Sequence, residues 1–179
     1  MMKNLDEFVY VENVLSREQC VHAIKTLDDG EWQPHRWYGW KDNEYHNNKD
    51  FDTAYSVDLQ VAWRDNIVGC INNYKKKYPN CDADHFCQIR FNKYNESQYI
   101  AKHVDHIRSL FDGKAKGVPL ISLVGLLNDD FEGGEFLLNG EDMELKAGDL
   151  LIFPSTFSYE HMTTPVAKGT RYSYVLWGW

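Results

Sequence analysis

The sequence predicts a mainly β fold with flanking α-helices, in which a β-sandwich or jelly roll carries N-terminal helices packed outside its sheets. Three observations support this prediction. Helical periodicity is confined to the first part of the chain, short β-rich segments separated by turn residues fill residues 85–179, and 43 % of the 179 residues are hydrophobic. A chain of this length and composition can bury a sizeable core, so we expect a single domain over residues 1–179.

Two helices are expected before residue 80. Ser16, followed three residues later by Gln19, has the capping-box pattern of a helix N-terminus. The second helix is expected over Leu59–Tyr78, where apolar residues that include Ala62 recur at helical spacing and a proline follows. Residues 1–80 are therefore expected to be a helical support beside the β-rich part.

The segments around these helices are harder to place. Phe8–Val11 has the composition of a short strand, and Trp32–Trp40 is aromatic and expected to be extended. Asp42–Asp52 is polar and is expected to be a surface loop. The whole of Trp32–Asp52 is a candidate substrate lid, in which aromatic residues such as Trp37 would stack on a substrate. A locally packed loop is the alternative.

Residues 85–179 are expected to form the jelly-roll core. Turn signals, such as the adjacent Asn139 and Gly140, separate its β-rich segments. The expected strands are His85–Lys93, Gln98–His103, Leu120–Leu127, Glu135–Leu138, Met143–Leu145, Leu150–Phe153, Ser158–Met162 and Arg171–Trp177. A jelly roll opens between its two sheets, and such openings commonly hold ligands.

The charge of the chain limits its partners. Acidic residues outnumber basic ones by 27 to 19, which gives a formal net charge of −8 and argues against nucleic acid as the main partner. No apolar run approaches the roughly 20 residues that span a membrane, and the first residues do not resemble a secretory signal. We therefore expect a cytoplasmic protein without a membrane partner.

A metal site is indicated by two separate histidines and one carboxylate. His103 and Asp105 are two residues apart, so on a strand both side chains point to the same face. His161, at the end of a later expected strand, would complete a set of two imidazoles and one carboxylate. This set is typical of non-haem Fe(II) oxygenases, and it leaves coordination positions open. By itself the first pair is a weak signal, because a strand histidine can simply be hydrogen-bonded.

Arg171, on the last expected strand, adds a second chemical signal. A dicarboxylate such as 2-oxoglutarate can chelate iron with its 2-oxo acid end, and its far carboxylate then needs a cation. Arginine offers a planar fork that binds a carboxylate through two parallel hydrogen bonds. The apolar and aromatic neighbours of Arg171 favour a buried position, whereas an isolated surface charge is the alternative.

Five motifs in residues 85–179 resemble the prolyl 4-hydroxylase-like branch of the Fe(II)- and 2-oxoglutarate-dependent dioxygenases. The fixed positions of the C-terminal motif H-x3-P-V-x2-G-x-R/K-x5-W are matched by His161, Pro165, Val166, Gly169, Arg171 and Trp177. The other four matching segments are Tyr94 to Asp105, Leu127-Asn128, Gly133 to Phe136 and Gly148 to Pro154. Two positions depart from the pattern: Ser97 replaces a glycine, and Tyr99 is one residue closer to Tyr94.

The resemblance implies a double-stranded β-helix, which is a jelly roll, and a role for several residues. His103, Asp105 and His161 would bind Fe(II). Arg171 and Tyr94 would bind the far carboxylate of the co-substrate 2-oxoglutarate. The implied substrate-binding residues are Trp177 and Tyr99, and Trp37 of the candidate lid is expected to contact the substrate as well. Packing in the core is the alternative role for Tyr94 and Trp177.

The resemblance also implies an activity. The expected enzyme is a dioxygenase (an oxidoreductase) that hydroxylates an unactivated C–H bond, releases succinate and CO2, and uses ascorbate as reductant. A prolyl residue of a peptide or protein is the favoured substrate, with another amino-acid side chain or a free amino acid as the alternative. A cupin-like isomerase or hydrolase and a non-catalytic jelly-roll binding module are the alternatives from other classes.

Overall fold

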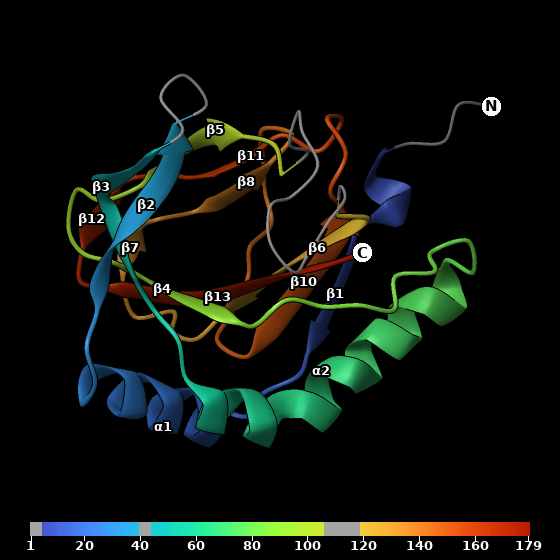
Figure 1. Ribbon diagram of the computed structural model, residues 1–179, viewed down its shortest axis with the longest axis horizontal. Helices are drawn as coiled ribbons and strands as arrows, with labels where there is room; N and C mark the ends of the chain where they lie inside the picture. The colour runs from blue at the N-terminus through green and yellow to red at the C-terminus, as the bar shows by residue number, and fades with distance from the viewer. Residues whose placement is uncertain (1–4, 40–43, 106–118) are drawn as a thin grey trace.

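The computed structural model describes residues 5–39, 44–105 and 119–179, with side chains described outside 5–6 and 37–49 (Figure 1). Its helices are η1 (Leu5–Phe8), α1 (Arg17–Asp28) and α2 (Val57–Lys77). Its strands are β1 (Tyr10–Asn13), β2 (Gln33–Gly39), β3 (Glu44–Ala54), β4 (Arg90–Tyr94), β5 (Ile100–His103), β6 (Ile121–Leu126), β7 (Glu132–Gly133), β8 (Phe136–Leu138), β9 (Glu141–Asp142), β10 (Asp149–Pro154), β11 (His161–Thr163), β12 (Val166–Lys168) and β13 (Arg171–Gly178).

The described strands form two larger sheets and one small one. The major sheet has the order β1-β10-β6-β13-β4-β3-β2, the minor sheet has the order β5-β11-β8-β9, and β12 pairs with β7. All strand pairs are antiparallel. The helices α1 and α2 lie outside the major sheet, on the side away from the minor sheet (Figure 1). This arrangement confirms the predicted jelly roll with flanking helices.

The major sheet has an apolar core on each of its faces. Trp63 of α2 packs edge-on against Phe91 of β4, with 5.6 Å between ring centroids, and also contacts Tyr174 of β13. On the other face, Phe153 of the major sheet packs against Phe136 of the minor sheet, with 6.2 Å between centroids. A sheet buried on both faces needs few polar side chains, which explains the nearly uninterrupted apolar composition of β6 and β10.

The N-terminal helix begins as the sequence predicts. The backbone N–H of Gln19 donates to the Ser16 hydroxyl over 3.2 Å, and the Gln19 side chain accepts from the Ser16 N–H over 2.8 Å. Both halves of the capping box are therefore present, so two of the otherwise unpaired N–H groups at this helix end are satisfied.

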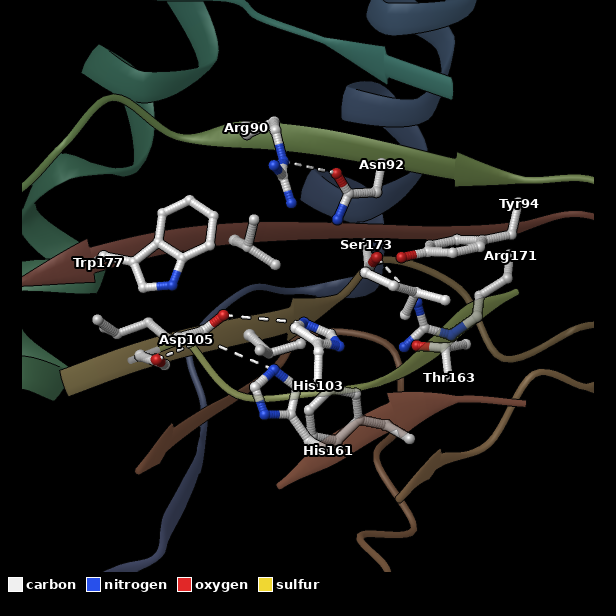
Figure 2. A pocket seen from close by; sticks show the side chains of 16 residues that line it. Arg90, Asn92, Tyr94, His103, Asp105, His161, Thr163, Arg171, Ser173 and Trp177 are labelled. Atoms are coloured by element: carbon white, nitrogen blue, oxygen red, sulfur yellow. Dashed lines mark hydrogen bonds and ion pairs between the residues drawn. The ribbon is translucent and has the colours of Figure 1, made fainter. Parts of the chain in front are cut away.

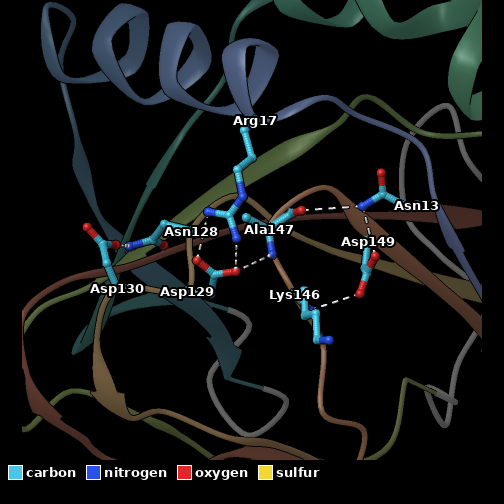
Figure 3. Close-up of polar contacts among 8 residues, drawn as sticks. All are labelled: Asn13, Arg17, Asn128, Asp129, Asp130, Lys146, Ala147 and Asp149. Carbon is cyan, nitrogen blue, oxygen red and sulfur yellow. Dashed lines mark hydrogen bonds and ion pairs between the residues drawn. The ribbon is translucent and has the colours of Figure 1, made fainter.

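Polar contacts join the start of α1 to the loops before β7 and β10 (Figure 3). The Arg17 guanidinium donates two hydrogen bonds, of 3.2 and 3.0 Å, to the Asp129 carboxylate, which also accepts from the Ala147 N–H. Nearby, Asn13 donates to Asp149 over 3.0 Å. Arg17 is largely exposed, so this pair fixes the position of the helix more than it adds to the stability of the fold.

Several details of the predicted elements are wrong: the strands predicted from His85 and from Ser158 begin only at Arg90 and His161, and three further differences follow. Where Asp42–Asp52 is described, it is not a loop but most of β3, which hydrogen-bonds to β2 and to β4. Met143–Leu145 is not a strand, and the strand lies just before it at β9. On α2, Ala62 is exposed and Trp63 is buried. The polar segment β3 is a strand because its backbone pairs with the neighbouring strands β2 and β4. The periodicity of its side chains does not predict this pairing.

We expect opposite stability changes from alanine at two glycines. A Cβ added to Gly125 of β6 would lie 2.0 Å from the buried Tyr174 ring, whereas one added to Gly69 of α2 meets nothing within 4 Å. Gly125→Ala should lower the free energy of unfolding by about 1–3 kcal/mol, and Gly69→Ala should raise it by about 0.5–1 kcal/mol. Chemical denaturation of both variants measures the two changes. Equal stability of Gly125→Ala and wild type would contradict the packing of Tyr174 on β6.

Candidate metal centre

Two strands of the minor sheet bring the three predicted ligands together. His103 ends β5, His161 begins β11, and the pairing of these strands places the two histidines opposite each other. Asp105 follows β5. The Nε2 atoms of His103 and His161 lie 3.8 and 3.6 Å from the two carboxylate oxygens of Asp105. The three ligand atoms all lie within 4.8 Å of one another, so one metal ion can contact all of them.

Backbone carbonyls orient both imidazole rings. The Nδ1 atom of His103 lies 2.8 Å from the carbonyl oxygen of Ala101, and the Nδ1 atom of His161 lies 3.1 Å from that of Tyr159. A carbonyl oxygen only accepts hydrogen bonds, so each Nδ1 carries the proton and each Nε2 keeps a free lone pair. Burial, together with the neighbouring His161, lowers the pKa of His103 and favours the neutral ligand form.

The carboxylate of Asp105 is held from the major sheet. Ser122 of β6 donates its hydroxyl to Asp105 over 2.6 Å, and its oxygen also lies 2.6 Å from the hydroxyl oxygen of Ser155. Burial alone would raise the pKa of Asp105, but the two imidazoles and the Ser122 hydroxyl outweigh it, so this pKa lies below its usual range. Asp105 is therefore presented to the site as an anion.

Loss of the Ser122 hydroxyl should weaken metal binding without removing a ligand. Outer groups that orient metal ligands typically change metal affinity by about 10- to 100-fold. We expect Ser122→Ala to weaken Fe(II) or Mn(II) binding within that range while the metal-free protein keeps its thermal stability. Calorimetric titration of the metal-free protein measures this affinity. Unchanged affinity would mean that Asp105 is oriented without Ser122.

A buried cation lies at the other end of the same cavity (Figure 2). Arg171 of β13 is only 2 % exposed, and its Nη1 donates to the Ser173 hydroxyl over 2.8 Å. Its guanidinium lies 5.3 Å from the centroid of the Tyr94 ring. Among the described residues no carboxylate pairs with Arg171, and its Nε has no hydrogen-bond partner. A buried guanidinium of this kind can bind an anion.

These residues fit ferrous iron and a dicarboxylate. Two neutral imidazoles and one carboxylate, held from one side, are the donor set that non-haem Fe(II) takes, and they leave positions free for other ligands. The unpaired guanidinium of Arg171 and the hydroxyl of Tyr94 line the cavity that also contains the three ligands. A molecule with a chelating end and a distant carboxylate can therefore contact both ends.

The N-terminal ribbon forms part of the same wall. His35 of β2 stacks on Phe51 of β3 with 4.2 Å between ring centroids, and Phe51 stacks on Tyr94 with 4.7 Å. The stack therefore connects the segment predicted as a lid to the residues around Arg171. Trp37 is on β2, but its side chain lies outside the described residues. Tyr99 is 42 % exposed and does not line the cavity, whereas Trp177 does.

Sequence reasoning missed several residues of the cavity. Arg90 and Asn92 line it together with Tyr94, and Ser122 and Ser173 contact the charged groups. A signal for the first two was present, because Arg90, Asn92 and Tyr94 alternate along one strand and so share a face. Polar residues repeated at every second position of a core strand indicate a wall of a polar cavity.

Comparison with known proteins now decides the family. Residues 89–179 match the protein family described as the 2OG-Fe(II) oxygenase superfamily. The chain belongs to this superfamily. The match covers His103, Asp105, His161 and Arg171, and it confirms the resemblance found in the motifs. This 2OG-Fe(II) oxygenase has no described helix that is both long and apolar enough to cross a membrane.

Curated relatives and solved structures agree with this placement. A PKHD-type hydroxylase of Aliarcobacter butzleri (strain RM4018) is 29 % identical over 178 residues, covering 94 % of this chain and 76 % of that protein. A PKHD-type hydroxylase of Saccharophagus degradans (strain 2-40) is 26 % identical over 175 residues, covering 93 % and 76 %.

Two solved structures share the fold of this oxygenase. The viral collagen prolyl hydroxylase of Paramecium Bursaria Chlorella virus-1, solved as a 2OG complex, has a TM-score of 0.71 at 17 % identity, covering 95 % of this chain and 94 % of that one. A prolyl hydroxylase of Trichoplax adhaerens, solved with a hypoxia inducible factor peptide fragment, has a TM-score of 0.72 at 13 % identity, covering 97 % and 84 %. At these identities the likeness concerns the fold.

Proposed function

We propose that this 2OG-Fe(II) oxygenase hydroxylates an unactivated C–H bond of a prolyl residue and releases succinate and CO2. The observation that carries the proposal is the pairing, in one cavity, of the three iron-type ligands with the buried and unpaired Arg171. Relatives named as hydroxylases and fold neighbours named as prolyl hydroxylases support the prolyl substrate.

Each residue of the cavity has a proposed role in this reaction. His103, Asp105 and His161 would hold Fe(II), and Arg171 together with the Tyr94 hydroxyl would bind the far carboxylate of 2-oxoglutarate. When bound, the iron and the co-substrate supply the oxidising power for breaking a C–H bond. The protein itself fixes their positions and, by burying the cavity, keeps bulk water away from the reacting atoms.

The side of the cavity around Trp177 is the proposed substrate side. The indole of Trp177 lies beside Asp105, on the side of the cavity opposite Arg171 (Figure 2). Tyr99 and Trp37 stay predicted substrate contacts from the surface and from the N-terminal ribbon. We further propose a single catalytic domain over residues 1–179, a cytoplasmic location, and ascorbate as the reductant that keeps the iron ferrous.

Succinate formation tests the proposal. Purified protein would be supplied with Fe(II), 2-oxoglutarate and ascorbate under air, with proline-rich peptides, the same peptides with alanine in place of proline, and free amino acids. We expect succinate formation to rise with a proline-containing member of a pair and not with its alanine partner. A rise with other amino acids alone would favour the alternative substrate. No succinate despite bound iron would favour a binding module or a non-oxidative metal enzyme.

A further inference from the structure

A second arginine projects into the cavity, on the substrate side. Arg90 of β4 is half-buried and points from the strand into the space between Trp177 and Asn92 (Figure 2). Its guanidinium lies 5.1 Å from the centroid of the Trp177 ring and 5.8 Å from that of Phe51. Trp177 lines the same cavity as the three predicted metal ligands, so Arg90 lies near the metal centre as well.

The groups that hold Arg90 are neutral. Its Nε donates to the side-chain oxygen of Asn92 over 3.1 Å, and its Nη1 lies 3.4 Å from Nε2 of His35. Burial, followed by the charge of Arg90, lowers the pKa of His35 to about 3, so this imidazole is uncharged at neutral pH and accepts from the guanidinium. In the part of the chain that the structure describes, no Asp or Glu forms an ion pair with Arg90.

The charges of the proposed complex leave Arg90 without a counterion among the residues that the structure describes. Ferrous iron is divalent, and its charge together with that of Arg171 is balanced by the Asp105 carboxylate and the two carboxylates of 2-oxoglutarate. Arg90 then contributes one further positive charge inside the cavity, where protein atoms replace much of the surrounding water. An arginine stays protonated under these conditions, and a cation in such a place is stabilised by an anion that comes with the ligand.

We propose that Arg90 binds a carboxylate of the substrate, and hence that the substrate has a free carboxylate near the carbon that is oxidised. The inference rests on the proposed oxygenase function and specifies the chemical class of its substrate. It favours proline with a free carboxyl group, as the last residue of a peptide or as the free amino acid, over an internal prolyl residue, whose carboxyl group is part of an amide. Arginine suits this task because its planar fork matches a carboxylate.

Matched acids and amides test this contact without turnover. Mn(II) replaces Fe(II), 2-oxoglutarate is saturating and oxygen is absent, and calorimetry measures the binding of five probes. The probes are free proline, prolinamide, the peptide Ala-Gly-Pro as acid and as C-terminal amide, and an amidated peptide with an internal proline. Comparison of the two acids, free proline and Ala-Gly-Pro, shows whether the site prefers a free amino acid or the C-terminal residue of a peptide. The variants are Arg90→Gln, Arg90→Lys and, as the matched control, Arg64→Gln on the exposed face of α2.

The wild type and Arg64→Gln should bind one acid about 10- to 100-fold more tightly than its amide. Arg90→Gln should lose this preference, and Arg90→Lys should keep part of it because the charge remains. The affinity for 2-oxoglutarate should change by less than about threefold in both Arg90 variants, since Arg171 binds the co-substrate.

Several results would overturn the inference. Equal binding of acid and amide by the wild type would show that Arg90 contacts a neutral group, such as a peptide carbonyl. A large loss of 2-oxoglutarate affinity in Arg90→Gln would assign Arg90 to the co-substrate instead. If 2-oxoglutarate binds normally and no probe binds, the proposed contact between Arg90 and a prolyl carboxylate is refuted, whereas the proposed co-substrate site stands. Failure to bind 2-oxoglutarate in the presence of metal would refute the proposed function and this inference together.

Discussion

Replacing His161 with alanine should weaken the binding of ferrous iron by more than about 100-fold and abolish succinate formation. Groups that only orient a metal ligand change affinity by about 10- to 100-fold, so removal of a ligand should exceed that range. His161 is 5 % exposed and its Nε2 lies 3.6 Å from Asp105, and the group of described residues that could hold a metal ion consists of His103, Asp105 and His161. Anaerobic calorimetric titration with Fe(II) measures the affinity.

His22→Ala is the matched control for this experiment. His22 is exposed on α1, on the outer side of the major sheet, and should bind neither metal nor substrate. The control variant should keep wild-type iron affinity and activity. Tight iron binding retained by His161→Ala would contradict the proposed centre, and it would mean that the metal is bound elsewhere on the chain.

Replacing Arg171 with alanine should weaken 2-oxoglutarate binding by at least about 100-fold and leave metal affinity within about threefold of wild type. Breaking a buried, hydrogen-bonded charge pair costs about 3–5 kcal/mol, because the remaining charge is left without a partner. In this variant the far carboxylate of 2-oxoglutarate would be that remaining charge. Titration of the Mn(II)-loaded protein with 2-oxoglutarate, without oxygen, gives the affinity.

Two further variants test whether the effect of Arg171→Ala is specific to this guanidinium. Arg64→Ala removes an exposed arginine of α2 and should leave the 2-oxoglutarate affinity unchanged. Tyr94→Phe removes one hydroxyl and should weaken 2-oxoglutarate by about 10-fold, less than the loss of the guanidinium. Unaltered 2-oxoglutarate affinity in Arg171→Ala would refute the role proposed for this residue, and a parallel loss of metal affinity would point to misfolding instead.

The candidate ligand residues were predictable from the sequence because their chemistry is local or rare. The spacing of His103 and Asp105 predicts side chains that point the same way, and the structure brings their ligand atoms within 4.8 Å although Asp105 lies just past the end of β5. The capping box at Ser16 was predictable for the same reason, since both of its partners lie within one helical turn. His161 and Arg171 could be added because the motif that contains them has a fixed length.

The rest of the site depends on contacts between distant segments. Asp42–Asp52 has the composition of a loop, yet most of it forms β3, because its backbone pairs with β2 and β4. That pairing places Phe51 and His35 against Tyr94 and Arg90. Side-chain composition does not report backbone hydrogen bonds between strands, so the wall formed by this ribbon could not be predicted.

The sequence by itself determined the fold class, the three candidate ligand residues and the arginine that faces them across the cavity. The tertiary structure decided which other charges share that cavity. Arg90 is one of several basic residues in the sequence, and only the packing of β4 against Trp177, His35 and Phe51 shows that it lies inside the cavity, held by neutral partners. Whether a charge is solvated or buried depends on what packs around it, and those neighbours come from distant parts of the chain.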